Sequence, residues 1–251
     1  MPMLLGTAVW SEGPGERRAL VARLASGRLA DLNRIEVMRL RKLGEGEPER
    51  LAEALVPASL RRLLEGGPRA LARARQTWAY AEKWDRRATL PATLAPSPEA
   101  VELLPCLPRP TALRRLDGSW LDRLAVRGPG AELTAPPQPG LAALGLAGGG
   151  MAGYCLALEE AGSAVLGAWL TDEWPAGQLE LKVGAARRTA PLKAWEGLEL
   201  PLLRAGEVML LPPPRLKPFS ELVGGTEVRL SAGFDQLVLR LGPEGVHPTV
   251  Q

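Results

Sequence analysis

The chain has 251 residues, is 46% hydrophobic and 24% charged, and carries a formal net charge of +3. This composition is typical of a soluble globular protein and excludes the disordered and fibrous classes, and the length allows one large domain or two of about 100–150 residues. The small net charge gives no electrostatic case for a nucleic-acid partner. The single histidine, His247, excludes histidine-rich metal sites and argues against a Ser-His-Asp or Cys-His mechanism unless the tail folds back.

The first third of the chain predicts a small hairpin followed by helices. Residues 3–10 form an apolar run that ends in Gly and Pro, which predicts a strand, and residues 28–32 predict the second strand of a hairpin. A helix is expected directly after this hairpin. Pro48 then opens a helical stretch that Pro57 is expected to break in two, and residues 69–87 predict a longer helix. The candidate buried positions of these helices are Leu51, Leu55, Leu60, Leu71, Trp78 and Ala81.

The rest of the chain predicts mostly strands. Residues 88–112 are rich in proline and predict a linker with one strand inside it. Because helices come early and strands come late, the pattern favours an α+β fold. We expect a small N-terminal α/β domain over residues 1–98 and a β-rich domain over residues 99–251. Short apolar or alternating runs predict the late strands at residues 179–183, 208–211, 228–230 and 237–241.

Cysteine usage and the first residues favour a cytoplasmic protein. Cys106 and Cys155 belong to no metal-spaced motif and are expected to be small buried hydrophobes in a reduced compartment. Residues 1–10 lack the basic start of a signal peptide. The composition contains 26 Arg against 5 Lys and a single Asn, which fits a heat-adapted or a GC-rich source.

Arginines give the early helices a basic side. Glutamates are interspersed among them, and no aromatic platform alternates with them. This pattern favours a salt-bridged, solvated surface over a nucleic-acid patch. The arginines are Arg61, Arg62, Arg69, Arg73 and Arg75.

A glycine-rich stretch from Gly148 to Gly153 matches G-x-G-x-x-G. Residues 154–161 are compatible with a helix, so the stretch resembles the opening of flavin-binding oxidoreductases, where glycines let the backbone approach a pyrophosphate. The acidic residue that would bind the ribose is missing, and Trp169 lies near its place. A turn between packed elements is favoured, with dinucleotide binding as the alternative. Residues 141–158 lack charges, but their glycines favour a buried core segment over a membrane span.

Two acidic pairs flank the strand-like run at residues 165–171, namely Glu159 with Glu160 and Asp172 with Glu173. Mg²⁺ prefers oxygen ligands, and carboxylates that converge at strand ends suit it. The alternative is that acidic pairs at the ends of elements are simply solvated.

Five stretches resemble the fumarylacetoacetate hydrolase family. Residues 27–33 (GRLADLN) resemble its G-R-x-x-D-L strand, residues 55–71 the helical segment that follows, and residues 101–110 (VELLPCLPRP) the start of its catalytic domain. Residues 203–210 resemble a later strand of the family, and residues 222–237 resemble its closing hairpin. The resemblance is strongest in the first half of the chain and weakest in the middle.

The resemblance implies a small α/β domain on a β-rich roll, commonly paired into homodimers. It also implies Mg²⁺, or another divalent ion such as Mn²⁺, held by an E-x-E strand and a later aspartate, with a histidine–carboxylate pair acting on water. Family members cleave, decarboxylate, hydrate or isomerise small oxo-acids. The metal would chelate a 2-oxo acid and stabilise the enolate that develops.

The middle of the chain departs from the family pattern. The G-Y-x-x-x-x-D strand of the family matches the residues up to Asp172, which makes this residue the expected metal ligand, with Glu159 or Glu160 beside it. Glu159 and Glu160 are adjacent, so on a strand they point to opposite faces and cannot both reach one ion. The lid motif lacks its histidine and leaves Asp122 as the candidate base. The T-G-T-P loop reads LPPP at residues 211–214, which removes its hydroxyl groups.

Two functions follow from these observations. One is a divergent, metal-dependent hydrolase, lyase or isomerase that acts on a small 2-oxo or β-diketo acid, with Asp172, Glu159 or Glu160 near the ion and Asp122 as the base. The other is a catalytically inactive relative that keeps the scaffold for binding or assembly. The missing histidine and the broken E-x-E pair favour the second, and the family favours the first.

Overall fold

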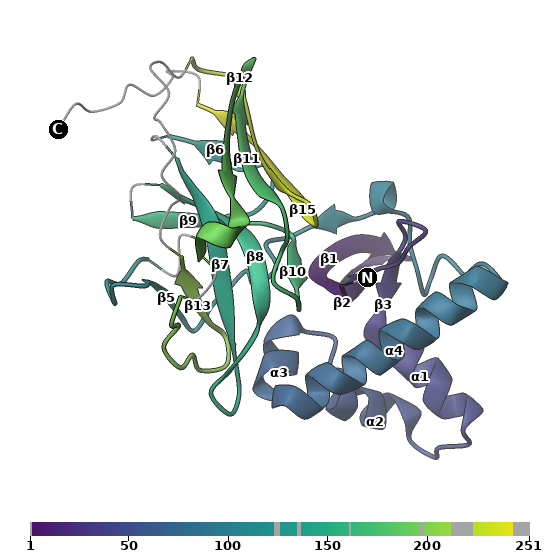
Figure 1. Ribbon diagram of the computed structural model, residues 1–251. Helices are drawn as coiled ribbons and strands as arrows, with labels where there is room; N and C mark the ends of the chain where they lie inside the picture. The colour runs from purple at the N-terminus through teal and green to yellow at the C-terminus, as the bar shows by residue number, and fades with distance from the viewer. Residues whose placement is uncertain are drawn as a thin grey trace.

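The computed structural model describes residues 2–122, 126–134, 137–160, 162–195, 198–211 and 223–242. Within these residues the α-helices all end by Arg87, and most strands follow them (Figure 1). The predicted α+β class is therefore confirmed.

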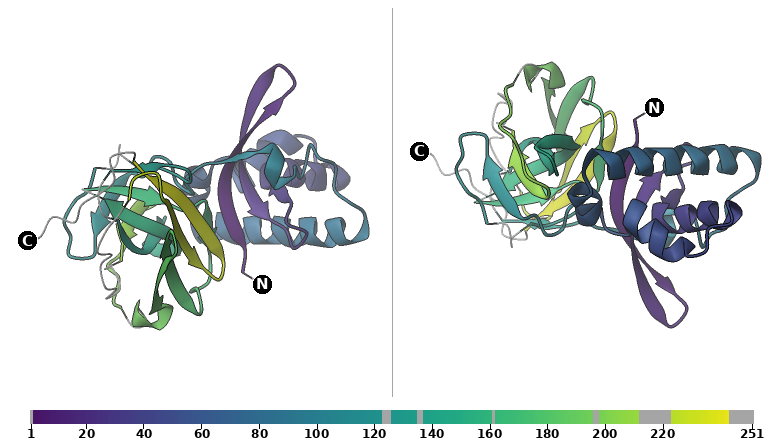
Figure 2. Two further views of the ribbon diagram at one scale, coloured as in Figure 1. Left: turned by 90° about the horizontal axis from the view of Figure 1, so that it is seen from above. Right: turned by 90° about the horizontal axis from the view of Figure 1, so that it is seen from below.

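The chain opens with an antiparallel hairpin that a third strand extends. β1 (Leu4–Glu12) pairs with β2 (Gly15–Arg23), and β2 pairs with β3 (Leu29–Asp31). Figure 2 shows this hairpin reaching past the helices. The strand predicted at residues 3–10 is confirmed, but residues 28–32 are not the second strand of the hairpin. That strand is β2, whose charged first half is mostly exposed and whose second half alone is buried.

Four α-helices follow the hairpin, broken at the prolines as predicted. Leu60 and Ala81 are buried, and Leu71 and Trp78 pack partly buried against the same core. The expected burial of Leu51 and Leu55 is wrong, because the second helix turns the side with Pro48 and Ala52 inward. The helices are α1 (Leu32–Lys42), α2 (Pro48–Leu55), α3 (Leu60–Glu65) and α4 (Gly67–Arg87).

Two sheets form most of the remaining structure. In the larger sheet the order is β3-β2-β1-β10-β8-β7-β13-β5, with β4 beside β1 and β9 beside β8, and in the smaller sheet it is β12-β11-β14-β15-β6. The four predicted late strands are confirmed as β11, β13, β14 and β15. The bounds are β4 (Glu102–Leu103), β5 (Ala112–Arg115), β6 (Glu132–Leu133), β7 (Gln138–Leu146), β8 (Gly150–Glu160), β9 (Ser163–Leu166), β10 (Trp169–Thr171), β11 (Gln178–Val183), β12 (Ala186–Pro191), β13 (Glu207–Leu210), β14 (Glu227–Ala232) and β15 (Asp235–Leu241), with 3-10 turns at Pro98–Ala100 and Leu192–Trp195.

The middle of the larger sheet is covered on both faces. Along β8, Cys155 and Ala157 face the core that the helices share. Leu156 and Leu158 face the core shared with the smaller sheet. This alternation is what a strand requires when each face is buried against a different layer. Figure 1 shows the helices gathered beside β1–β3, apart from β11, β12 and β15.

A three-residue strand joins the N-terminal hairpin to the rest of the larger sheet. β10 pairs with β1, where Leu170 lies opposite Leu5, and with β8, where Thr171 lies opposite Tyr154. At Gly153, beside this pairing, a Cβ atom would clash with the carbonyl oxygen of Thr171. The larger sheet therefore continues across residue 98, and the division into domains at that residue stays a prediction.

The glycine-rich stretch is a hairpin turn between β7 and β8. Gly148 and Gly149 have φ angles of +91° and +81°, a conformation that favours glycine. The helix considered for residues 154–161 is wrong, because residues 154–160 belong to β8 and alternate between two cores. The stretch thus lacks the helix N-terminus that would hold a pyrophosphate, and the favoured turn is confirmed. Within the described ranges, no helix is long and apolar enough to cross a membrane.

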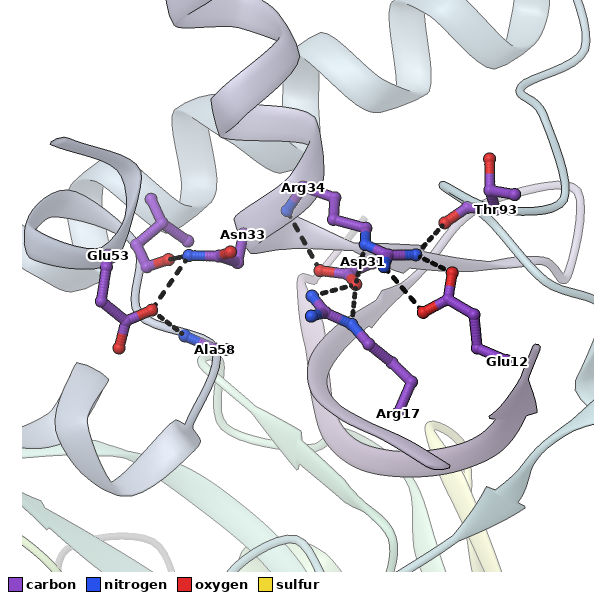
Figure 3. Close-up of polar contacts among 9 residues, drawn as sticks. Glu12, Arg17, Asp31, Asn33, Arg34, Glu53, Ala58 and Thr93 are labelled. Carbon is purple, nitrogen blue, oxygen red and sulfur yellow. Dashed lines mark hydrogen bonds and ion pairs between the residues drawn. The ribbon is translucent and has the colours of Figure 1, made fainter. Parts of the chain in front are cut away.

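A buried carboxylate, Asp31, ties the hairpin to α1 (Figure 3). Its Oδ1 accepts from the backbone amide of Arg34 at 3.1 Å and so caps α1, while Arg17 donates to its Oδ2 from Nε at 3.0 Å and from Nη2 at 2.7 Å. Arg34 in turn donates to both carboxylate oxygens of Glu12 and to the carbonyl oxygen of Thr93. Burial raises the pKa of Asp31, and the charge of Arg17 acts against that effect. The aspartate of the G-R-x-x-D-L pattern therefore has a structural role.

Replacing Arg17 with alanine removes the larger of the two charges that offset the burial of Asp31 and leaves Arg34, whose Nε lies 3.8 Å from Oδ2. We expect Arg17→Ala to lower the free energy of unfolding by about 3 kcal/mol, because breaking a buried pair leaves the carboxylate with too little compensating charge. Urea unfolding followed by circular dichroism measures the change. Arg18→Ala is the matched control, since Arg18 is exposed on the same strand and forms no ion pair with a described residue. Its expected effect is within about 0.5 kcal/mol, and equal losses in the two variants would contradict the assignment.

Candidate functional site

Glu159 lies near the end of β8, on the sheet face that Ala157 shares. Arg115, at the end of β5, places its Nε 2.9 Å from Oε1 and 3.0 Å from Oε2, and its Nη2 also donates to Oε1. The hydrogen bond to Glu159 raises the pKa of Arg115. One guanidinium group therefore engages both oxygens of this carboxylate.

Strand β7 supplies no second carboxylate beside Glu159. Gln138 lies opposite Glu159 and Gly140 lies opposite Ala157, and cross-strand partners share a face of the sheet. These two positions, two residues apart, are where an E-x-E pair would face Glu159. The cavity that these residues help to line has a volume of about 10 Å³, which is room for about one water molecule.

The family pattern fits β8 better than β10, because Gly167 is followed by alanine and lies five positions before Asp172 where the pattern needs six. Gly153 and Tyr154 precede Glu159 with the spacing of G-Y-x-x-x-x-D, with glutamate in place of aspartate. The alignment that ends at Asp172 does not include Arg115 in the predicted site. The sequence signal for this second alignment was present in the glycine–tyrosine pair.

Glu160 points to the other face of β8, as the alternation of a strand predicts. Its side chain is only 1% exposed and accepts from the guanidinium of Arg127 and from the backbone amide of Thr134. Arg127 also donates to the carbonyl oxygen of Glu132 at 2.6 Å. Glu160 therefore binds β8 to the segment that precedes β7, which contains Arg127 and Thr134. It does not share a site with Glu159.

Asp172 follows β10 and holds the N-terminal elements against it. Its Oδ1 accepts from the backbone amide of Met3 at 3.2 Å, and its Oδ2 accepts from Arg75 of α4. The side chain is 4% exposed. Thr171 lies opposite Tyr154, and Glu159 lies five residues further along β8, which is about 16 Å of strand. The structure does not bring Asp172 together with either glutamate.

Asp122 lies in the segment after β5, with an exposed side chain. Its backbone amide donates to the carbonyl oxygen of Gly162 at 3.2 Å. Its role as a base stays a prediction. Residues 212–214 of the LPPP loop, and His247, lie outside the described residues.

The carboxylates predicted as metal ligands do not form a metal site. Among the residues that the structure describes, no three His, Cys, Asp or Glu side chains come together in an arrangement that could hold a metal ion. Each predicted ligand already accepts from an arginine, and a guanidinium beside the oxygens opposes a divalent cation by like-charge repulsion. The donor set present here therefore does not fit the Mg²⁺ or Mn²⁺ that the family resemblance implies. The pairs are Asp172 with Arg75, Glu159 with Arg115, and Glu160 with Arg127.

An apolar cavity of about 420 Å³ opens on the Tyr154 face of β8. The rings of Tyr154 and Trp174 meet edge to face with centroids 4.5 Å apart. Burial raises the pKa of Tyr154. Its lining has no charged side chain among the described residues, so it offers an oxo-acid no counter-charge. The lining residues are Met151, Tyr154, Trp174, Trp195, Leu198, Leu200 and Leu211.

The two cysteines, far apart in the sequence, meet in the core. Both are buried and form no disulfide, as expected for small hydrophobes. A hydrogen bond with the Cys106 thiol and complete burial raise the pKa of Cys155. The Cys155 thiol is therefore not activated as a nucleophile.

Asp235, at the start of β15, is a buried carboxylate that sequence reasoning missed. The Gln236 amide donates to its Oδ1 at 2.7 Å, and Oδ2 has no hydrogen-bond partner within the described residues. Burial raises the pKa of Asp235 to about 7, against the backbone amides of Gln236 and Trp169 and the charge of Arg23. The signal was its alternation with Leu237, Leu239 and Leu241 on the buried face of β15.

The raised pKa of Asp235 predicts that the contribution of this residue to stability falls as the pH rises. The folded-state pKa lies above the unfolded one, so ionisation opposes folding increasingly between these two values. Relative to Asp235→Asn, we expect the wild type to lose about 2–3 kcal/mol of unfolding free energy between about pH 5 and pH 8. Urea unfolding of both proteins across this range measures the difference. Parallel pH profiles would contradict the assignment.

Solved structures share the fold of this chain. The structure of maleylpyruvate hydrolase from Sphingobium sp. SYK-6, in complex with manganese(II) and pyruvate, has a TM-score of 0.53 at 12% identity and covers 98% of this chain and 100% of that one. 2-Keto-3-deoxy-D-arabinonate dehydratase, complexed with magnesium and 2,5-dioxopentanoate, has a TM-score of 0.52 at 10% identity and covers 96% and 99%. No family model and no curated protein matches the sequence. The predicted fumarylacetoacetate hydrolase-like fold is thus confirmed over nearly the whole chain.

Proposed function

We propose that this protein is a non-catalytic relative of the fumarylacetoacetate hydrolase fold that serves in binding. The observation that carries the proposal is the pairing of each candidate metal ligand, Asp172, Glu159 and Glu160, with its own arginine. Chelation of an oxo-acid needs a divalent cation with open coordination positions, and these arginine-paired carboxylates do not provide a site for such a cation.

The position of Arg115 supports this proposal most directly. Its guanidinium supplies the positive charge at Glu159 and engages both carboxylate oxygens. A metal ion there would have to displace this bidentate pair, which is among the stronger ion-pair geometries in proteins. Gln138 and Gly140 on the neighbouring strand add no negative charge to favour the exchange.

The second candidate is the metal-dependent hydrolase, lyase or isomerase acting on a small 2-oxo or β-diketo acid. It is favoured by the two enzymes that share the fold, which were solved with Mn²⁺ and pyruvate and with Mg²⁺ and 2,5-dioxopentanoate. In this reading Asp172, Glu159 or Glu160 holds Mg²⁺ or Mn²⁺, and Asp122 acts as the base. A cytoplasmic location and a homodimer are proposed for either function.

Divalent metal ions separate the two candidates. For the wild type we expect saturating Mg²⁺ or Mn²⁺ to shift the melting temperature by less than about 1 °C, because a ligand stabilises a protein only when it binds the folded state. We also expect no ion to remain after desalting. Differential scanning fluorimetry and elemental analysis measure these quantities. A bound ion in the wild type, lost in Glu159→Gln or Asp172→Asn, would overturn the non-catalytic proposal.

A variant that restores the acids is the positive control. Gln138→Glu with Gly140→Glu and Arg115→Ala places three carboxylates beside one another on β7 and β8. We expect this triple variant to gain a Mn²⁺-dependent rise in melting temperature of several degrees, because the ion binds the folded state. Gly140 is buried, and a Cβ atom there already meets the carbonyl oxygen of Leu211 at 3.4 Å, so the metal-free triple variant is first compared with the wild type by circular dichroism.

A further inference from the structure

A cleft beside the first hairpin is lined by arginines from three separate elements. Its volume is about 440 Å³, within the range of small-molecule sites. Thr7 and Ser59 also line it, and Glu53 is the one acid among its described lining residues. The arginines are Arg18 of β2, Arg61 and Arg62 of α3, and Arg109 of the segment after β4.

Two of these four arginines have their charge neutralised within the protein. Arg61 donates to Glu65 at 3.0 Å, and Arg62 donates to Glu53 at 2.8 Å. Arg18 and Arg109 form no ion pair with any residue in the described ranges. The cleft therefore presents about two positive charges without a counter-charge.

Glu53 cannot neutralise the two remaining arginines. Its Oε2 accepts from the side-chain amide of Asn33 and from the backbone amide of Ala58, each at 3.3 Å (Figure 3). Its Oε1 accepts from Arg62. The carboxylate is thus held by the helical region, and Arg18 and Arg109 face the cleft without it.

A second arginine-lined cavity, of about 360 Å³ beside α1, shows the contrast. There Arg17 pairs with Asp31, Arg34 with Glu12, and Arg41 with Glu49. Each arginine in that cavity meets an acid of the protein. The cleft at Arg18 and Arg109 differs, because no acidic residue of the described chain pairs with these two arginines and their charge is available to a bound anion.

We propose that this cleft binds a small anion of the phosphate class. A phosphate monoester carries about −1.5 to −2 charges near pH 7, which matches the two unpaired arginines. The planar guanidinium fork suits phosphate oxygens, and converging arginines are the usual means of recognising this group. The volume fits one small molecule and not a macromolecular surface. The inference deepens the proposed binding role by naming the class of ligand.

Titration with inorganic phosphate and pyrophosphate at fixed ionic strength tests the proposal. Isothermal titration calorimetry of the wild type is expected to show saturable binding at one site, with pyrophosphate tighter than phosphate. We expect Arg18→Gln and Arg109→Gln each to weaken binding about tenfold or more, because each removes charged hydrogen bonds to the anion. Arg18 and Arg109 are exposed, so both variants are expected to keep the melting temperature of the wild type.

Arg87→Gln is the matched control, since Arg87 is an exposed arginine at the last turn of α4 and is not part of the cleft lining. It is expected to bind pyrophosphate like the wild type. Binding that is absent, that Arg87→Gln weakens as much as Arg18→Gln does, or that favours the monocarboxylate pyruvate over phosphate would overturn the proposal. The metal titration is independent of this one, so failure of the anion site and failure of the non-catalytic role are separate results.

Discussion

The structure depends on pairing most of the carboxylates that it buries with an arginine. Removing a carboxylate from water is costly unless a charged partner and hydrogen bonds replace the solvent. Arginine suits this task because its fork can donate to both oxygens and because it stays charged when buried. The arginine-rich composition, which the sequence connects only with the source of the protein, thereby acquires a structural meaning. The buried carboxylates and the arginines that reach them are Asp31 with Arg17, Glu36 with Arg73, Asp172 with Arg75 and Glu160 with Arg127. Asp235 shows the other outcome, since burial with only backbone donors raises its pKa to about 7.

The same ion pairs connect the layers of the fold. Within the described residues, the larger sheet passes from the N-terminal hairpin to β8 and the strands beyond it through β10 alone, which has three residues. Asp172 strengthens this narrow junction, because it accepts from the amide of Met3 at the start of the hairpin and from Arg75 of α4. Gly153 lets β8 approach β10 closely enough to pair. Asp172, the residue predicted as a metal ligand, therefore holds the two parts of the larger sheet together through these hydrogen bonds.

Local patterns predicted most elements, and the errors have identifiable physical causes. Prolines located the helix boundaries, and apolar alternation located the late strands, because both signals act within a few residues. The sequence pattern does not indicate β2, because exposed charged residues occupy its first half. Residues 154–160 are compatible with a helix in sequence because β8 is apolar on both faces. The site was harder, since it depends on register. Whether Gln138 or a carboxylate lies opposite Glu159 is decided by the pairing of β7 with β8, and whether Arg115 reaches it is decided by β13 lying between β7 and β5.

The distribution of unpaired charge separates the two regions where a ligand might have been expected. At Glu159 the positive charge belongs to Arg115, a residue of the chain itself. This charge is therefore permanent, and a guanidinium has no coordination position that a substrate oxygen could occupy. A bound metal ion differs in this respect, because it keeps open positions for substrate oxygens. At Arg18 and Arg109 the positive charge has no internal partner within the described residues. Charge that is already balanced stabilises the fold, and charge that is left unbalanced in a cleft attracts a ligand of opposite sign. By this criterion the charge at Glu159 contributes to the stability of the fold, and the cleft at Arg18 and Arg109 is where an anion is expected to bind.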